Sequence, residues 1–213
     1  MCSIAALLHA RADATAGDYR AHAERVRESF APRFFRDELG YLADVVDGPD
    51  GDDVRLRPNQ IFAVSLPYPL LEGAQAASVL DAVGRALLTP LGLRSLASDD
   101  PAYLPHHRGT PAERDAAYHQ GTVWGWLIGP WVDAWLKVHP EDRVGARRFL
   151  DGSIAALGAF GLGTIGEIFD AESPYTPRGC IAQAWSVAEV LRCWVKTAPD
   201  STPPHTAEAP VTA

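Results

Sequence analysis

The stretch that decides the fold is GAFGLGTIGEIFDAESPYTPRGCIAQAWSVAEVLR, residues 158–192. It begins with a glycine-rich turn, places Glu167 in a short apolar segment, and passes a proline-bounded loop before Arg178 opens a predicted helix. Gln183 and Trp185 follow at the start of that helix. A carboxylate, an arginine, an amide and an indole are thus gathered on a loop and one helical turn. Because loops on a rigid scaffold commonly carry binding and catalytic groups, this stretch is the first candidate site.

The composition is that of a globular protein. The chain has 213 residues, of which 47% are hydrophobic and 22% charged, and it could form one domain or part of a larger one. Its net charge of −8 argues against a nucleic-acid partner, because a phosphate backbone requires a basic surface. No apolar run approaches the roughly 20 residues that span a bilayer, so no membrane partner is expected. A neutral ligand suits this charge balance.

The cysteines and the N-terminus favour a cytoplasmic protein. Cys2, Cys180 and Cys193 are too few and too widely spaced for a disulfide framework or a zinc motif, so we expect reduced thiols. The first residues, MCSIAALLHARAD, contain an apolar run with no basic residue before it, which makes a poor signal peptide.

Helical periodicity dominates the chain, and no segment shows sustained period-two alternation. The sequence therefore predicts an all-α protein built as an array of helical hairpins. The expected helices cover residues 3–14, 19–30, a short segment from 58, 73–88, 121–138, 141–157 and 179–196. Pro32 is expected to end or kink the second of these, and Pro130 to cause a kink or a restart. Residues 89–120 are expected to form a long connection, which is usually functional when it is not disordered.

The domain organisation follows from a change in composition near the C-terminus. Residues 1–198 are expected to form the catalytic unit, and residues 199–213, rich in Pro, Thr and Ala, a disordered tail.

Glu167 is the leading candidate for chemistry. A carboxylate among Ile165, Ile168 and Phe169 could act as a general base or acid if it faces a cavity. The alternative is a structural ion pair with Arg178, and the two roles are compatible because an arginine can position a catalytic carboxylate.

Other polar groups give weaker signals. Asp99-Asp100 could supply a second carboxylate of a glycoside hydrolase, but this pair before a proline is also an ordinary turn or cap. His106, His107 and His119 lack the spacing of a zinc motif, so no metal is predicted, and nothing indicates a cofactor. His119-Gln120 is better explained as a hydrogen-bonding pair facing a pocket or as a helix cap.

Tryptophan is concentrated in residues 124–135, where a stripe at helical spacing indicates core packing. Trp124 and Trp185 differ, because each lies near a helix start beside an amide, Gln120 and Gln183 respectively. Indole faces flanked by amides and carboxylates are suited to binding a sugar.

Several motifs in the same order carry a family resemblance over most of residues 31–192. They are Arg57-Pro-Asn-Gln-Ile-Phe-Ala-Val-Ser-Leu-Pro67, Gly92-Leu-Arg-Ser-Leu96 with Asp99-Asp-Pro-Ala-Tyr103, Tyr118-His-Gln-Gly-Thr-Val-Trp124, Glu167-Ile-Phe-Asp170, and Pro177-Arg-Gly-Cys-Ile-Ala-Gln-Ala-Trp-Ser-Val-Ala-Glu189. Together they resemble the C-terminal part of the glycogen debranching enzyme, or amylo-α-1,6-glucosidase, family.

The resemblance implies an (α/α)6 toroid, of which this chain would form about the C-terminal half. It implies a hydrolase of glycogen catabolism that cleaves α-1,6-glucosidic branch points of glycogen or limit dextrin with inversion. It carries over Glu167 as the catalytic base. It also implies a set of substrate-binding residues: Arg57, Asn59, Gln60, Arg94, His119, Gln120, Trp124, Arg178, Gln183 and Trp185.

Two features depart from the family pattern. Gly125 stands where the family usually has a proline, so the helix after Trp124 could start differently. The Thr-Trp-Met-Asp stretch, whose aspartate is the family's general acid, is absent from these 213 residues. We therefore expect a truncated catalytic domain that requires a complementing N-terminal segment. The alternatives are a non-catalytic glucan-binding remnant and another helical-toroid glycosidase, such as a glucoamylase or trehalase relative.

Overall fold

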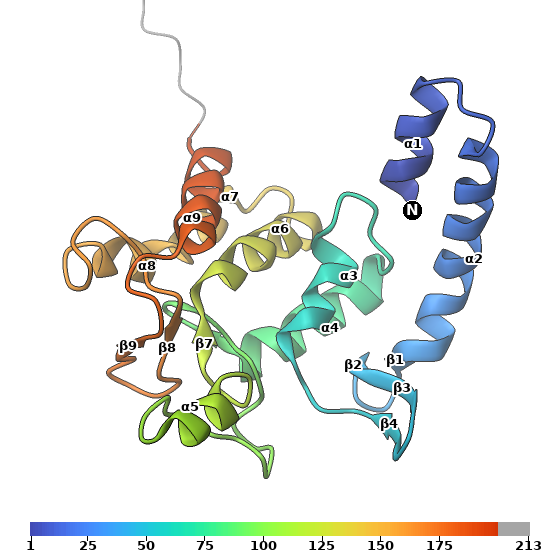
Figure 1. The fold of residues 1–213 in the computed structure, drawn as a ribbon. Coiled ribbons are helices and arrows are strands. Elements are labelled where there is room, and N and C mark those ends of the chain that lie inside the picture. Colours follow the sequence, from blue (N-terminus) through green and yellow to red (C-terminus); the bar gives the residue numbers. More distant parts are fainter. Residues whose placement is uncertain (200–213) are drawn as a thin grey trace, which may run out of the picture.

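Helices dominate residues 1–199, the part of the chain that the computed structural model describes (Figure 1). The α-helices are α1 (Cys2–Ala10), α2 (Ala16–Phe34), α3 (Phe62–Ser65), α4 (Gly73–Ala86), α5 (Pro111–Ala117), α6 (Ile128–Val138), α7 (Arg143–Arg148), α8 (Asp151–Ala156) and α9 (Ala184–Lys196). The 3₁₀ helices η1 (Pro58–Ile61) and η2 (Gly125–Leu127) precede α3 and α6. The tail predicted at residues 199–213 lies, apart from Pro199, outside the described residues.

The observed helices differ from the predicted ones at several points, and three prolines lie at or near these points. Pro32 lies inside α2, which continues to Phe34, so of the two predicted effects, an end or a kink, the end does not occur there. Pro130 lies in the first turn of α6, where a missing N–H is harmless, so the predicted restart is what occurs. Pro58 is the first residue of η1, for the same reason. The helix expected over residues 141–157 is divided into α7 and α8.

A small sheet that the sequence did not predict joins the helices at one end. It is antiparallel, in the order β5 (Leu88–Thr89), β6 (Gly92–Arg94), β7 (Val123–Trp124), β8 (Ile168–Phe169) and β9 (Pro177–Arg178). The stretch 89–120, expected as a plain connection, therefore contains β6 and α5. Strands of two or three residues are too short to show alternation, and both residues of β7 and of β8 are buried.

Two further hairpins follow α2. β1 (Phe35–Arg36) pairs with β2 (Tyr41–Leu42), and β3 (Val45–Gly48) pairs with β4 (Gly51–Asp53). The acidic residues Asp47, Asp50, Asp52 and Asp53 lie in the second hairpin.

Two glycines permit close approaches that define the core. A Cβ on Gly84 of α4 would lie 2.9 Å from the ring of Trp131, the largest fully buried side chain. Gly92 has a φ of +149°, and a Cβ there would lie 2.2 Å from the carbonyl oxygen of Trp124. Gly92 therefore allows β6 to approach β7, the strand that carries Trp124, closely.

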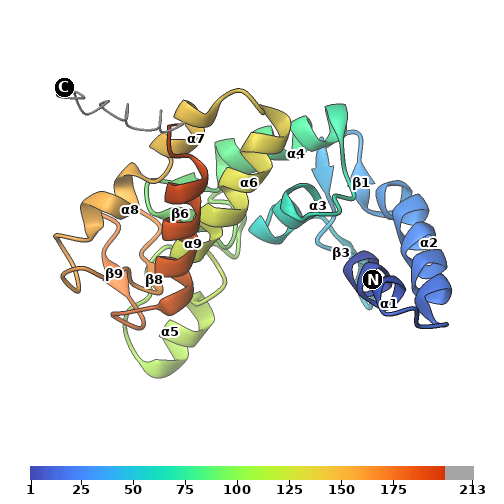
Figure 2. The same ribbon diagram turned by 90° about the horizontal axis from the view of Figure 1, so that it is seen from above.

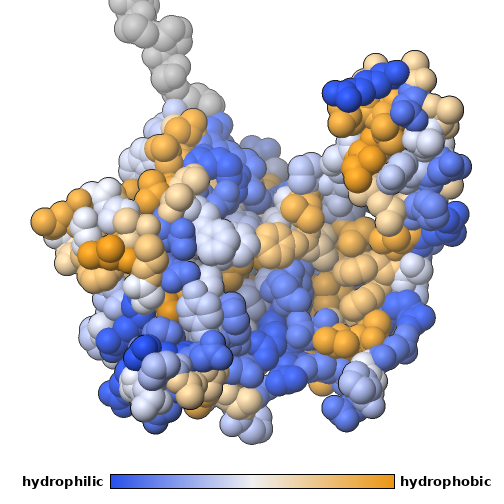
Figure 3. Space-filling model, viewed as in Figure 1, coloured by the Kyte–Doolittle hydropathy of each residue, from blue (hydrophilic) through white to orange (hydrophobic). Residues whose placement is uncertain are grey.

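The helical hairpin of α1 and α2 stands apart from the remaining helices (Figures 1 and 2). Apolar side chains gather on the surface between the α1–α2 hairpin and the rest of the molecule (Figure 3). Two grooves lie there, of about 260 and 290 Å³, and Leu66, Tyr68 and Leu70 line both. Phe30 and Phe34 of α2 also line the first groove.

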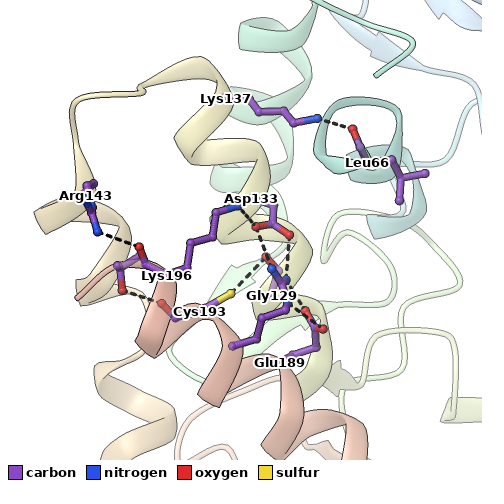
Figure 4. A network of polar contacts seen from close by, with 10 residues as sticks. Leu66, Gly129, Asp133, Lys137, Arg143, Glu189, Cys193 and Lys196 are labelled. Atoms are coloured by element: carbon purple, nitrogen blue, oxygen red, sulfur yellow. Dashed lines mark hydrogen bonds and ion pairs between the residues drawn. The ribbon is translucent and has the colours of Figure 1, made fainter. Parts of the chain in front are cut away.

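Polar contacts fasten α9 to α6 (Figure 4). Asp133 of α6 accepts hydrogen bonds from Lys196 at 2.6 Å and from Arg192 at 2.8 Å. The buried Cys193 lies against the carbonyl oxygen of Gly129, and burial raises the pKa of its thiol to about 12, so it stays protonated. These contacts fix the C-terminal half of α9 against α6. No helix within residues 1–199 is both long and apolar enough to cross a membrane.

Candidate active site

A pocket of about 660 Å³ opens between the small sheet, η1 and the start of α9. It is within the size range of small-molecule sites. Its lining combines aromatic rings with a few polar groups: Asp44, Arg57, Pro58, Asn59, Phe62, Ser95, Tyr118, His119, Trp124, Trp126, Leu127, Glu167 and Trp185.

Glu167 is held by the sheet and by three donors. It directly precedes β8, where Ile168 pairs with Trp124 of β7 on one side and with Arg178 of β9 on the other. The Tyr118 hydroxyl donates to its Oε1 at 2.6 Å, and the Cys180 N–H donates to its Oε2 at 3.0 Å. The Gln183 amide approaches Oε1 at 3.5 Å, a long contact. The carboxylate is therefore oriented at the pocket wall by groups that themselves belong to fixed elements.

Tyr118 is a dependable donor to this carboxylate. Burial, and then its hydrogen bond to Glu167, raise the pKa of its hydroxyl to about 12, so it remains protonated at neutral pH. Its backbone carbonyl also accepts from the Trp124 indole N–H at 3.1 Å and from the Thr122 hydroxyl at 2.7 Å. Tyr118 thus orients both the carboxylate and the neighbouring indole.

Arg57 links three segments on the opposite side of the pocket. Its guanidinium donates to the carbonyls of Ser95 and His119, at 3.0 and 2.7 Å. It also donates to Gln120 Oε1 at 2.8 Å and lies 3.5 Å from Asp44 Oδ2. Arg57 therefore lines the pocket mainly as a structural hub.

Aromatic rings form the rest of the wall. The imidazole of His119 stacks on Trp124, with centroids 4.9 Å apart and planes within 5°. Trp126 stacks on Trp185 at 5.5 Å and on Phe62 at 5.8 Å. Burial, and then the nearby Arg57, lower the pKa of His119, so its ring is neutral at pH 7. Trp185, at the end of the stack, is 46% exposed and offers indole surface to a ligand.

The structure brings six of the eleven predicted site residues into the pocket lining: Glu167, Arg57, Asn59, His119, Trp124 and Trp185. The other five lie behind or beside it: Gln60, Arg94, Gln120, Arg178 and Gln183. Gln60 is 6% exposed and bonds the backbone of Leu42 and Arg57. Arg94 donates to the carbonyls of Ala171 and Ala86, both at 3.3 Å.

Arg178 pairs with a different carboxylate from the one expected. It donates to Asp170 at 2.8 Å, so the predicted ion pair with Glu167 is wrong. Both residues lie on the β8–β9 hairpin, and Asp170 is almost completely buried. Burial alone would raise the pKa of Asp170, but Arg178 and the His107 N–H hold it below its ordinary value. The arginine therefore supports the hairpin that carries Glu167.

Asp100 behaves as a turn residue. Its carboxylate accepts the Ala102 N–H at 2.8 Å, and neither member of the Asp99-Asp100 pair lines the pocket. His119 and Gln120 follow α5 and do not cap a helix start. No group of three or more His, Cys, Asp or Glu side chains within residues 1–199 is arranged to hold a metal ion.

Four pocket residues with chemical significance were missed. Tyr118 and Trp126 adjoin predicted residues, and Phe62 lies within the motif that begins at Arg57, so neighbouring positions gave a signal. Asp44 gave none, because its approach to Arg57 and Asn59 depends on the turn after β2.

Comparisons with known proteins show the family and the fold of the chain. Residues 3–192 match a protein family described as amylo-alpha-1,6-glucosidase. Over 98 residues the chain is 30% identical to the glycogen debranching enzyme of Saccharomyces cerevisiae, covering 43% of this chain and 6% of that protein. The neutral trehalase Nth1 of the same yeast superposes with a TM-score of 0.59 at 17% identity, covering 87% of this chain and 31% of the trehalase.

The trehalase comparison shows the fold alone. The trehalase fold is an (α/α)6 toroid. The prediction that this chain is mainly helical and forms part of such a toroid is therefore confirmed. The chain spans less than a third of the length of either relative.

Proposed function

Because the chain belongs to the amylo-alpha-1,6-glucosidase family, we propose that its pocket binds the branch point of an α-glucan and that Glu167 is the base of an inverting glycosidase. The reaction is hydrolysis of an α-1,6-glucosidic bond in glycogen or limit dextrin. One observation carries the proposal: the Glu167 carboxylate lines a pocket walled by indoles and is oriented by Tyr118 and Cys180.

The chemistry follows from this placement. In an inverting glycosidase, a carboxylate removes a proton from the water that attacks the anomeric carbon. At the same time, a carboxylic acid on the other face protonates the departing glycosidic oxygen. The three donors on Glu167, of which Gln183 is the most distant, leave it a lone pair for a water, because a carboxylate has about four acceptor positions. The indoles of Trp124 and Trp185 would pack against the apolar faces of the glucosyl ring.

We propose that the general acid is the aspartate of a Thr-Trp-Met-Asp stretch on a complementing segment, and that this segment packs against the exposed apolar surface. Support comes from the share of the relatives that the chain covers and from the grooves beside α2. We place the protein in the cytoplasm, since its three cysteines are free thiols.

The test is glucose release from a branched limit dextrin, by the chain with and without that segment. Activity only in the mixture is the expected result, and release by the purified chain alone would contradict the need for a complement. Comparing α-1,6 and α-1,4 substrates distinguishes a debranching enzyme from a glucoamylase-like one, and hydrolysis of trehalose identifies a trehalase-like one. If the mixture is inactive but still binds glucan, the chain is a glucan-binding remnant.

A further inference from the structure

Among the described residues, the pocket is lined by two carboxylates, Glu167 and Asp44. The proposed reaction uses Glu167 as the base and gives no role to Asp44. Asp44 lies beside Arg57, Asn59 and Phe62, whereas Glu167 lies beside Tyr118 and Trp185. Asp44 comes from the turn between β2 and β3, which is distant in sequence from the hairpin that carries Glu167. Its side chain is 15% exposed, so it is accessible only through the pocket and the adjoining groove that it also lines.

The surroundings of Asp44 fix it without using all of its acceptor positions. Asn59 Nδ2 donates to Oδ1 at 2.8 Å, and Arg57 Nε lies 3.5 Å from Oδ2. Arg57 is in turn held by the carbonyls of Ser95 and His119. Because a carboxylate has about four lone-pair positions, Asp44 can accept further hydrogen bonds from a ligand.

These partners argue against Asp44 as a proton donor. A general acid must carry a proton, whereas both neighbours of Asp44 are donors that require a lone pair. Next to it, Phe62 stacks on Trp126 and supplies an apolar surface. A fixed charged acceptor beside aromatic rings is suited to a sugar, which presents hydroxyls at its rim and C–H groups on its faces.

We propose that Asp44 accepts a hydrogen bond from one hydroxyl of the bound glucosyl unit and thereby determines which sugars the site accepts. The inference rests on the proposed glucan pocket and adds a specificity residue to it. A hydroxyl pointing at Asp44 forms a charge-assisted bond, so an epimer or deoxy sugar that lacks it leaves the carboxylate unpaired.

The experiment pairs protein variants with altered ligands. Methyl α-maltoside and its monodeoxy analogues are titrated by NMR against the full chain, the Asp44→Asn variant and an Asp133→Asn control. Asp133 is matched, because it is an ion-paired aspartate with 17% side-chain exposure and lies outside the pocket. For wild type, one deoxy analogue should bind about tenfold more weakly than the parent, the usual loss when a charge-assisted bond is removed.

The Asp44→Asn variant should bind the parent about tenfold more weakly and show less than a twofold further loss with that analogue. The Asp133→Asn control should retain the wild-type values. If Asp44→Asn does not fold, Asp44→Glu keeps the charge, displaces it by one methylene, and should likewise lose the discrimination between the parent and that analogue.

Three results would overturn the inference. Parent affinity within twofold of wild type, or an unchanged ranking of the analogues, would mean that Asp44 binds no hydroxyl. Normal binding with lost turnover in the complemented enzyme would make Asp44 the acid. Wild-type chain that binds no maltoside would remove the proposed function as well, which separates the two failures.

Discussion

Replacing Asp170 by asparagine tests whether a buried ion pair supports the hairpin that carries Glu167. The Asp170 side chain is 6% exposed and accepts hydrogen bonds from Arg178 Nη2 at 2.8 Å and from the His107 N–H at 2.9 Å. His106 lies 3.6 Å away. Asparagine retains one acceptor for the N–H but leaves the guanidinium without its charged partner.

The magnitude follows from the burial of the two partners. Breaking a fully buried pair costs about 3–5 kcal/mol of unfolding free energy. The Arg178 side chain is 33% exposed, so water compensates for part of the loss and we expect about 2–3 kcal/mol. For a chain of this length, that corresponds to a fall in melting temperature of roughly 4–12 °C at pH 7.

The pH dependence gives a second signature. The pKa of Asp170 is lowered in the folded state, so its contribution to stability is present above the ordinary aspartate pKa of 3.8 and is lost as pH falls through the lower folded value. The gap between wild type and Asp170→Asn should therefore shrink below about pH 4.

Urea unfolding of wild type, Asp170→Asn and a Glu172→Gln control measures both effects. Glu172 is exposed on the same loop and its carboxylate accepts a hydrogen bond from the Tyr103 hydroxyl, so its replacement by glutamine, which keeps an acceptor, should change stability by less than about 0.5 kcal/mol. An Asp170→Asn variant as stable as wild type at pH 7, or a gap that does not narrow in acid, would refute the reasoning.

Three further changes test other parts of the account. Tyr118→Phe removes the 2.6 Å donor to Glu167 and should lower kcat of the complemented enzyme roughly 10–100-fold with little change in KM, whereas an equal rise in KM would show a binding role. Gly92→Ala should cost roughly 2–4 kcal/mol in thermal unfolding, because its Cβ would meet the Trp124 carbonyl; Gly158→Ala, with open space around it, is the neutral control. Trp185→Ala should weaken maltooligosaccharide binding about 5–10-fold by calorimetry, and Trp194→Ala, on the same helix but outside the pocket, should not; equal effects would remove the aromatic wall from the site.

The sequence predicted the helices because their information is local. Residues 73–88 carry a complete apolar stripe, and α4 occupies nearly the same range. The small sheet could not be predicted in this way. Ile168 and Phe169 are both buried, so they show no alternation, and their pairing with Val123 and Trp124 is set by chain packing over a long sequence separation.

The same distinction applies to the site. Glu167, Trp124 and Trp185 stand in motifs that could be recognised one segment at a time. The partner of Arg178 could not, because Glu167 and Asp170 both shortly precede it in the sequence and the β8–β9 register decides between them. Asp44 reaches the pocket only through contacts with Asn59 and Arg57, which no local pattern encodes.

The central claim is that Glu167 activates water in a glucan pocket, and Glu167→Gln tests it most directly. In the complemented enzyme, kcat for glucose release from limit dextrin should fall by about 10²–10⁴, the usual contribution of a general base. The Kd for a maltooligosaccharide should stay within twofold of wild type. Turnover unchanged by this substitution would contradict the account.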